Sequence, residues 1–463
     1  MKISKGLFIR DKSFYKTLLM VALPIVFQNM ITIGVNIMDT VMLGNYGEIQ
    51  LSASSLANNF IDVFYVLHMG MGGGAAVLVS QYWGTKDLEG SKKVIAITFR
   101  MSLCAIVLFT LITAIAPRGI MSLYSDDLQV IDKGRIYFLV SLPAYLLQGV
   151  SMVMTLTLRA MRKVMVPFAA SVVSFFINVF FNWVFIFGNL GAPEMQIAGA
   201  ALGTVLARVA EFLIIGVYFF FVEKQINFSF KDLVGSCRGQ WLMFFRYGIP
   251  VIVSDFLVTM GNSCLSSIMG HVGTNFVAAY SIAAPVMRLS NVFTMGLAQA
   301  AATMTGNIVG TGDREKSQQC GMTCLALALC TGLFASIAIL LLGPSIVGIY
   351  RVETYTKEIA YELMSSISLL MVFQAAQSVL TKGILRGGGD TRFVMIADAL
   401  FMWILSIPLG YCCGLIWKLS PFIIYLALRS DFVVKTIWCT VRLLNGKWIK
   451  QIKKHGGVIK NAG

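Results

Sequence analysis

The chain has 463 residues, of which 57% are hydrophobic and 13% charged, and its mean hydropathy is +0.77. This balance excludes a soluble protein with an ordinary charged surface and predicts a polytopic, all-α membrane protein. The net charge of +15 would suggest a nucleic-acid partner only if the basic residues formed one patch, and their distribution along the chain shows that they do not.

About a dozen nearly uncharged stretches of roughly 20 or more residues follow one another, and each is long enough to cross the hydrocarbon core as a helix. Because backbone polar groups find no partner in lipid, such stretches must be helical. The twelve predicted spans are 17–43, 52–82, 94–115, 136–158, 164–188, 196–222, 241–269, 277–309, 318–349, 355–381, 393–415 and 421–441.

The charged residues sort by side of the membrane. With the N-terminus placed in the cytoplasm, the inner segments hold 25 Lys and Arg and the outer segments hold five. This is the positive-inside pattern, and an even number of helices puts both termini in the cytoplasm. Anionic lipid headgroups account for the basic excess. We therefore expect a multi-pass monomer in the bacterial inner (plasma) membrane, with the lipid bilayer and no nucleic acid as partner.

A charged octapeptide occurs twice, as "GTKDLEGS" at 84–91 and "GTGDREKS" at 310–317. A shift of 226 residues aligns 24–91 with 250–317 without a gap and gives 17 identities in 68 positions. One residue of slippage later, "TLTLRAMRKV" at 155–164 corresponds to "KGILRGGGDT" at 382–391. The octapeptide itself is predicted to be a capped turn between helices.

The repeat predicts two lobes, 1–230 and 231–463, with six helices each. Because six is even, the lobes have the same orientation and are related by a pseudo-twofold axis along the membrane normal. Internal repeats of this kind build secondary transporters, whose substrate path lies at the repeat interface.

Ionisable residues inside the spans indicate where the chemistry lies, because a carboxylate in hydrocarbon is costly unless it faces protein or water. Asp39 follows Pro24 by 15 residues, and the proline ring should kink this helix. Asn178 and Asn182 share one helical face, and Thr204 lies on the next span. Carboxylate, amide and hydroxyl oxygens suit a hard monovalent cation. The alternative is that Asp39 is a structural carboxylate satisfied by neighbouring amides.

The second half offers weaker candidates. Asp255 follows Pro250 by five residues, and Gln374 is a polar residue of the tenth span, so the two form a possible second site. Asp398 is a further ionisable residue, for which a functional and a purely structural role are equally compatible with the sequence. Asp431 and Lys435 are four residues apart and should form an ion pair on one helix.

Asp62 and Arg288 are exactly 226 residues apart in the repeat and opposite in sign. They could form a latch between the lobes, or each could pair within its own lobe.

Other protein classes lack their motifs. Histidine occurs only at positions 68, 271 and 455, so no HExxH metalloprotease motif exists, and no GxSxG or Walker motif is present. The nine cysteines lie mostly in predicted helices without accompanying ligands, which favours packing over a metal site. We expect no enzyme activity, no cofactor, and no bound metal beyond a coupling sodium ion.

Several motifs together resemble the multidrug and toxic compound extrusion (MATE) family. They are "LPIVFQNMITIGVNIMDTVMLGNYG" at 23–47, "QYWGTKD" at 81–87, "LRAMRKVMVP" at 158–167, "NVFFNWVFIFGNLG" at 178–191, "GAALGT" at 199–204, "LRGGGDTR" at 385–392 and "NGKW" at 445–448. The resemblance covers the chain from the first to the twelfth predicted helix.

The resemblance implies a secondary multidrug exporter that exchanges cationic or amphipathic drugs for sodium ions or protons by alternating access. Asp39 matches the family's ion-coupling aspartate, and Asn178, Asn182 and Thr204 match residues that line its site. Some members have a second acid where this chain has Asn182, which leaves one titrating group here. The alternative function is a flippase for lipid-linked sugar precursors, which shares the superfamily's lobe architecture.

Overall fold

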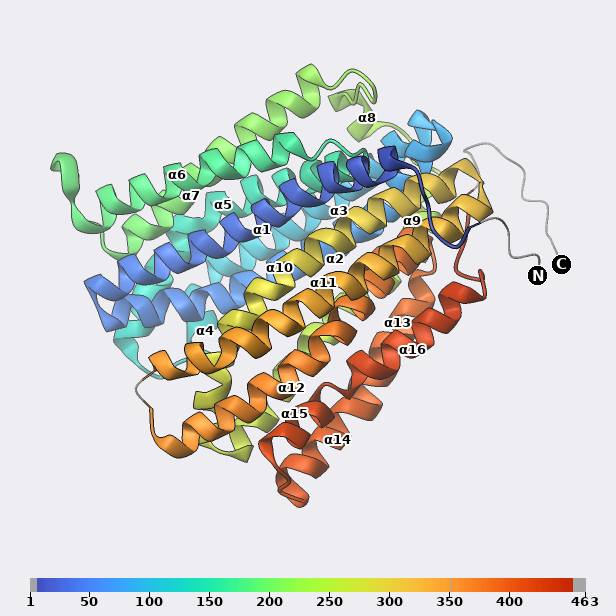
Figure 1. Ribbon diagram of the computed structural model, residues 1–463. Coiled ribbons are helices and arrows are strands. Elements are labelled where there is room, and N and C mark those ends of the chain that lie inside the picture. The colour runs from blue at the N-terminus through green and yellow to red at the C-terminus, as the bar shows by residue number, and fades with distance from the viewer. Residues whose placement is uncertain (1–5, 351, 453–463) are drawn as a thin grey trace. The chain divides into compact units, whose positions relative to one another are not determined.

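The structure is a computed structural model that describes residues 6–350 and 352–452. These residues form helices and connections without any strand (Figure 1). Eleven helical stretches among them are long and apolar enough to cross a membrane. The all-α prediction is therefore confirmed.

The long stretches follow the predicted spans closely. They are α1 (Lys12–Tyr46), α2 (Glu48–Thr85), α3 (Leu88–Ile115), α5 (Leu128–Ala160), α6 (Met165–Phe187), α7 with η2 (Ile197–Val222), α9 (Gln240–Val272), α10 (Thr274–Thr311), α11 (Arg314–Ile349), α12 with η3 (Thr354–Leu385), and the run of α13, η4, α14 and η5 (Thr391–Ile416). The short helices α4 (Pro117–Ser122), η1 (Asn189–Gly191) and α8 (Phe230–Val234) lie in the connections.

The twelfth predicted span, 421–441, is not one unbroken helix. It is divided at Arg429 into α15 (Pro421–Leu428) and α16 (Ser430–Leu444). The break is stabilised by side chains: Arg429 donates to Asn262 Oδ1 at 2.7 Å, and the backbone N–H of Asp431 donates to Ser406 Oγ at 2.8 Å. These bonds provide partners for polar groups at the interruption, as the low-dielectric surroundings require.

The chain divides into two compact units. We call residues 27–79 and 88–245 the N unit, and residues 1–26, 80–87 and 246–463 the C unit. The start of α1 and the end of α2 thus belong to the C unit. The predicted lobe boundary between residues 230 and 231 remains a prediction.

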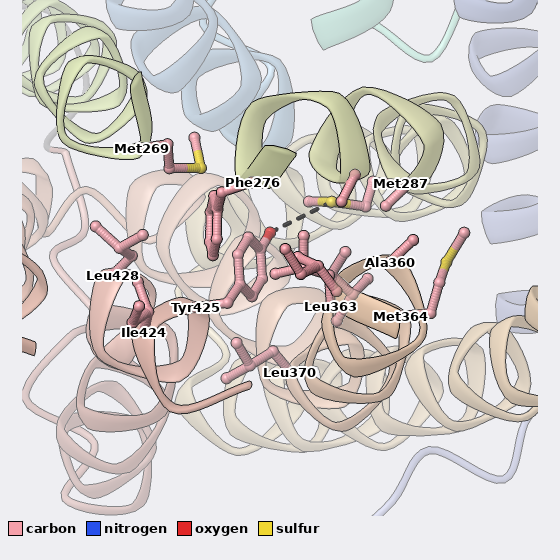
Figure 2. Packing of buried hydrophobic residues seen from close by; sticks show 14 of the residues in the cluster. Met269, Phe276, Met287, Ala360, Leu363, Met364, Leu370, Ile424, Tyr425 and Leu428 are labelled. Atoms are coloured by element: carbon pink, nitrogen blue, oxygen red, sulfur yellow. Dashed lines mark hydrogen bonds between the residues drawn. The ribbon is translucent and has the colours of Figure 1, made fainter. Parts of the chain in front are cut away.

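The core of the N unit lies among α1, α2, α5 and α7, where Leu43, Ala57, Phe138 and Ala201 are almost completely buried. In the C unit, Tyr425 of α15 lies inside an apolar cluster from α9, α10, α12 and α15 (Figure 2). Its hydroxyl donates to Met287 Sδ at 3.3 Å. Because buried tyrosine hydroxyls need a partner, this contact satisfies the one polar atom that Tyr425 brings into the cluster.

The repeated octapeptide is a turn between helices in both copies, as predicted. α2 ends at Thr85 and α3 begins at Leu88, while α10 ends at Thr311 and α11 begins after Asp313. The third residue of each copy is left-handed, with φ 61° at Lys86 and 84° at Gly312. In the second copy, Asp313 Oδ1 accepts from the backbone N–H of Lys316 at 3.0 Å and caps α11.

Within the C unit, the ends of α2 and α10 cross at repeat-equivalent glycines. A Cβ on Gly84 would lie 2.1 Å from the carbonyl oxygen of Asn307, and one on Gly310 would lie 2.2 Å from that of Gln81. Only glycine permits this approach of the two backbones. The repeat is therefore preserved in the reciprocal contact as well as in the sequence.

The predicted orientation can be tested with single cysteines at Glu48, Glu194 and Lys231, which are all exposed. We expect an impermeant thiol reagent added to intact cells to label positions 48 and 194 but not 231, because basic segments stay inside. The parental chain with its native cysteines is the control. Labelling of position 231 from outside would contradict the orientation.

Candidate functional site

Three helices of the N unit bring the four predicted ion-site residues together. Asn182 Nδ2 of α6 donates to Asp39 Oδ1 of α1 at 2.5 Å and to Asn178 Oδ1 at 3.2 Å. Asn178 Nδ2 in turn donates to Thr204 Oγ1 of α7 at 3.4 Å. The result is a continuous polar chain from the carboxylate to the threonine hydroxyl.

The close approach of α6 and α7 makes this chain possible. A Cβ on Gly203 would lie 2.2 Å from Asn182 Oδ1, and one on Gly199 would lie 2.5 Å from the backbone of Phe185. Small residues at a helix interface let the backbones approach within a membrane. Gly203 therefore positions the Asn182 amide, and its importance was not predicted from the sequence.

A polar pocket adjoins this cluster inside the N unit. The empty space in and in front of it is about 490 Å³, part of which is open to the surroundings. Its lining comes from α1, α6 and α7 and consists of Gln28, Ile31, Thr32, Val35, Asn36, Ser171, Ser174, Asn178, Thr204, Ala207, Arg208 and Glu211. Asn178 and Thr204 belong to both the pocket and the Asp39 cluster, so the two sites share residues.

The charges of this region leave one carboxylate uncompensated. Arg208 Nη1 lies 2.5 Å from Glu211 Oε2, so these two lining residues neutralise each other. Asp39 has no ion-pair partner among the described residues. Asn182 Oδ1 is also buried, with no hydrogen-bond donor among the residues that the structure describes. A carboxylate oxygen and an unused amide oxygen are ligands that a monovalent cation would accept.

The two predicted second-site residues are not linked in the C unit. Asp255 forms a bidentate ion pair with Arg386, at 2.8 and 3.2 Å. Gln374 Nε2 instead donates to Asn291 Oδ1 at 2.5 Å. Because the guanidinium already compensates Asp255, this carboxylate differs from Asp39 in its need for an external cation.

The predicted partners Asp431 and Lys435 lie close together and have a third member. Lys435 Nζ is 3.0 Å from Asp431 Oδ2 and 3.0 Å from Asp398 Oδ1. Sequence spacing predicted the contact within α16 but not the contribution of Asp398 from α13 (Thr391–Ala399). This group of three residues is called the Lys435 triad below.

The remaining candidates are simpler. Asp62 lies in the N unit and Arg288 in the C unit, and neither forms an ion pair within its own unit among the described residues. Their latch stays a prediction. Pro24 lies inside α1, which continues as one helix on both sides of it, and the kink also stays a prediction.

Gln28, which lines the pocket, was not predicted from the sequence. Gln28 Oε1 accepts from Arg159 Nη2 at 2.5 Å, and Gln28 Nε2 donates to the carbonyl oxygen of Pro167 at 3.4 Å. Gln28 thereby ties α1 to the ends of α5 and α6 beside the pocket. Its position on the same face of α1 as Thr32 and Asn36 was the available signal.

A repeated all-α membrane protein with an uncompensated carboxylate beside a polar pocket has the features of a secondary transporter. Comparison with known families makes this specific. The model of the MatE family matches residues 24–184 and again residues 250–412, which together are more than half of the chain. The chain therefore belongs to the MATE family, and its two matches begin at the predicted repeat distance.

Known proteins are similar along nearly the whole chain. A probable multidrug resistance protein NorM of Thermotoga maritima is 24% identical over 441 residues, covering 94% of this chain and 93% of the relative. A probable multidrug resistance protein YoeA of Bacillus subtilis is 21% identical over 431 residues, with 92% of each protein covered.

Solved structures share the fold. A crystal structure of a MATE protein in the straight conformation has a TM-score of 0.83 at 19% identity, and covers 93% of this chain and 96% of that one. An outward-facing MATE family transporter has a TM-score of 0.83 at 20% identity, with the same coverage. The predicted MATE fold is confirmed.

The role of Gly203 can be tested without changing a polar group. We expect Gly203→Ala to displace the Asn182 amide and to abolish transport, because its new methyl group would overlap Asn182 Oδ1. Gly216→Ala is the matched control on the same helix, since its Cβ would meet only Met154 Cε at 3.9 Å.

Transport by both variants is measured as uptake of a fluorescent dye into inverted membrane vesicles, at equal protein amounts. Normal activity of Gly203→Ala would show that the close approach of α7 is not required to position Asn182.

Proposed function

We propose that the chain is a secondary active multidrug exporter of the bacterial inner membrane, driven by sodium ions or protons that bind at Asp39. The observation that carries the proposal is the uncompensated Asp39 carboxylate, joined through Asn182 and Asn178 to a pocket residue, Thr204. Family membership and relatives that are named multidrug resistance proteins support the substrate class.

Asp39 has two states that differ in charge. Without a bound cation or proton, its negative charge lies near the pocket and favours a cationic drug. With the charge neutralised, that attraction is lost. Cation and drug are therefore reciprocally coupled through one charge, as linkage requires.

The chemistry of the pocket lining also suits amphipathic compounds. Ile31, Val35 and Ala207 supply apolar surface, while Asn36, Ser174 and Thr204 supply hydrogen-bonding groups. Such mixed linings are typical of small-molecule sites. Alternating access would expose this pocket to the two sides of the membrane in turn.

The charge balance disfavours the flippase alternative. A lipid-linked pyrophosphate would need unpaired cationic side chains, because each phosphate carries negative charge. The basic residue that lines the pocket, Arg208, is already paired with Glu211. The two charged residues of the lining therefore neutralise each other.

Removal of the Asp39 charge tests the proposal. Asp39→Asn keeps the size of the side chain, so we expect normal expression and insertion, drug binding that is retained with the weaker affinity of the neutralised state, and loss of gradient-driven efflux. Asn178→Ala and Asn182→Ala should reduce efflux partially, because each removes one oxygen beside the carboxylate.

Efflux is followed in vesicles under a sodium gradient alone and then under a proton gradient alone, which also identifies the coupling ion. If Asp39→Asn still concentrates drug against its gradient under either ion, the coupling site lies elsewhere.

A further inference from the structure

The internal repeat also includes one ion pair in each half of the chain. Lys163 pairs with Glu223 in the N unit. A shift of 227 residues turns these positions into Asp390 and Lys450, which pair in the C unit with the signs exchanged. The shift found at 155–164 therefore also holds about 60 residues later, and we apply it to the positions in between.

Under this shift, three residues that line the N-unit pocket correspond to the Lys435 triad. Ser171 corresponds to Asp398, Thr204 to Asp431, and Arg208 to Lys435. A fourth lining residue, Gln28, corresponds to Ser254 under the earlier shift of 226. The C unit thus has a copy of the pocket position, but the copy holds two acids and one base.

The Lys435 triad is closed and almost fully bonded. Ser254 Oγ donates to Asp398 Oδ2 at 2.5 Å, and Ser406 Oγ donates to Asp431 Oδ1 at 3.2 Å. The side chains of Lys435, Asp398 and Asp431 are 3%, 6% and 1% exposed. The ammonium group lies between two carboxylates at 3.0 Å from each, where a free monovalent cation would also be stabilised.

The corresponding base in the N unit is held differently. Arg208 contacts a single acid, Glu211, one turn further along α7, and both line the open pocket. Asp39, which is joined to the pocket through Asn182 and Asn178 and has no ion pair among the described residues, is therefore left to bind an exchangeable charge. The N-unit copy of the site therefore needs a cation from outside the chain, whereas the C-unit copy contains the ammonium group of Lys435.

We propose that Lys435 is a tethered cation that permanently fills the C-unit copy of the site, so that the chain exchanges its coupling ion in the N unit alone. The claim that the coupling ion exchanges in the N unit alone rests on the proposed function, whereas the claim that Lys435 is a tethered cation does not. Burial of all three side chains favours a fixed charge, because separating the ammonium from its carboxylates would leave buried charges unpaired.

The proposal predicts a latent cation site. Lys435→Ala would leave two carboxylates and the space of the lysine side chain, which a small ammonium ion can enter. Lys435→Met is the matched control, since it also removes the charge but fills that space with an unbranched apolar chain. Methylammonium is the probe, and choline, which is too large for the space, keeps the ionic strength constant.

The experiment measures thermal unfolding of the purified full-length chain in detergent. In choline chloride, Lys435→Ala should unfold at a lower temperature than the wild type. Methylammonium chloride should raise its midpoint by several degrees, because a ligand that binds only the folded state stabilises it. The wild type and Lys435→Met should show no such specific rise.

If Lys435→Ala cannot be purified, Asp431→Asn with Lys435→Ala is measured in the same way, since it leaves one carboxylate for one cation. An equal rise in the Met variant, or no rise in the Ala variants, would overturn the tethered-cation proposal. No drug or gradient is present, so this outcome is independent of the exporter proposal.

The claim that the coupling ion exchanges in the N unit alone is tested with sodium on Asp39→Asn. Since the wild-type C unit already holds its own cation, sodium should not raise the unfolding midpoint of Asp39→Asn relative to choline. A specific rise in this variant would show an exchangeable ion outside the Asp39 site, and would overturn the claim of a single exchanging unit.

Discussion

The proposed function depends on one acidic side chain, Asp39, that has no basic partner among the described residues. Glu211, Asp255, Asp398 and Asp431 each have a basic group within 3.0 Å, whereas Asp39 has amide hydrogen bonds and no ion-pair partner among the described residues. A charge in such surroundings is costly until a proton or cation neutralises it. In the proposed function Asp39 takes up an ion from outside, and the polar chain to Thr204 would place that event beside the pocket.

The two copies of the internal repeat carry different side chains at corresponding positions, and the N and C units therefore differ in chemistry. In the N unit, the small residues of α7 let Asn182 reach Asp39, and a pocket stays open beside them. In the C unit, the corresponding positions carry Asp398, Asp431 and Lys435, and the charges satisfy one another. An internal repeat preserves topology more strictly than chemistry, because helix packing depends on size whereas ion binding depends on a few side chains.

The helices, the repeat and the grouping of Asp39 with Asn178, Asn182 and Thr204 could be predicted from the sequence, because apolar length, self-similarity and the cost of a buried charge are all visible there. The break at Arg429 could not, since residues on both sides of it are apolar and the stabilising bonds come from Asn262 and Ser406. The pairing of Asp255 with Arg386 joins residues 131 positions apart, and no helical spacing indicates it. Gly203 was not predicted, because the need for glycine at this position depends on Asn182 Oδ1 of α6 lying opposite it.

The central claim is that one charge at Asp39 couples ion and drug, and equilibrium binding tests it most directly. Drug affinity of the purified chain is measured against sodium concentration at fixed pH, and against pH without sodium. The account predicts that the drug dissociation constant rises with one of these ions in the wild type, with a slope of about one ion per drug, and stays constant in Asp39→Asn. An unchanged ion dependence in Asp39→Asn would contradict it.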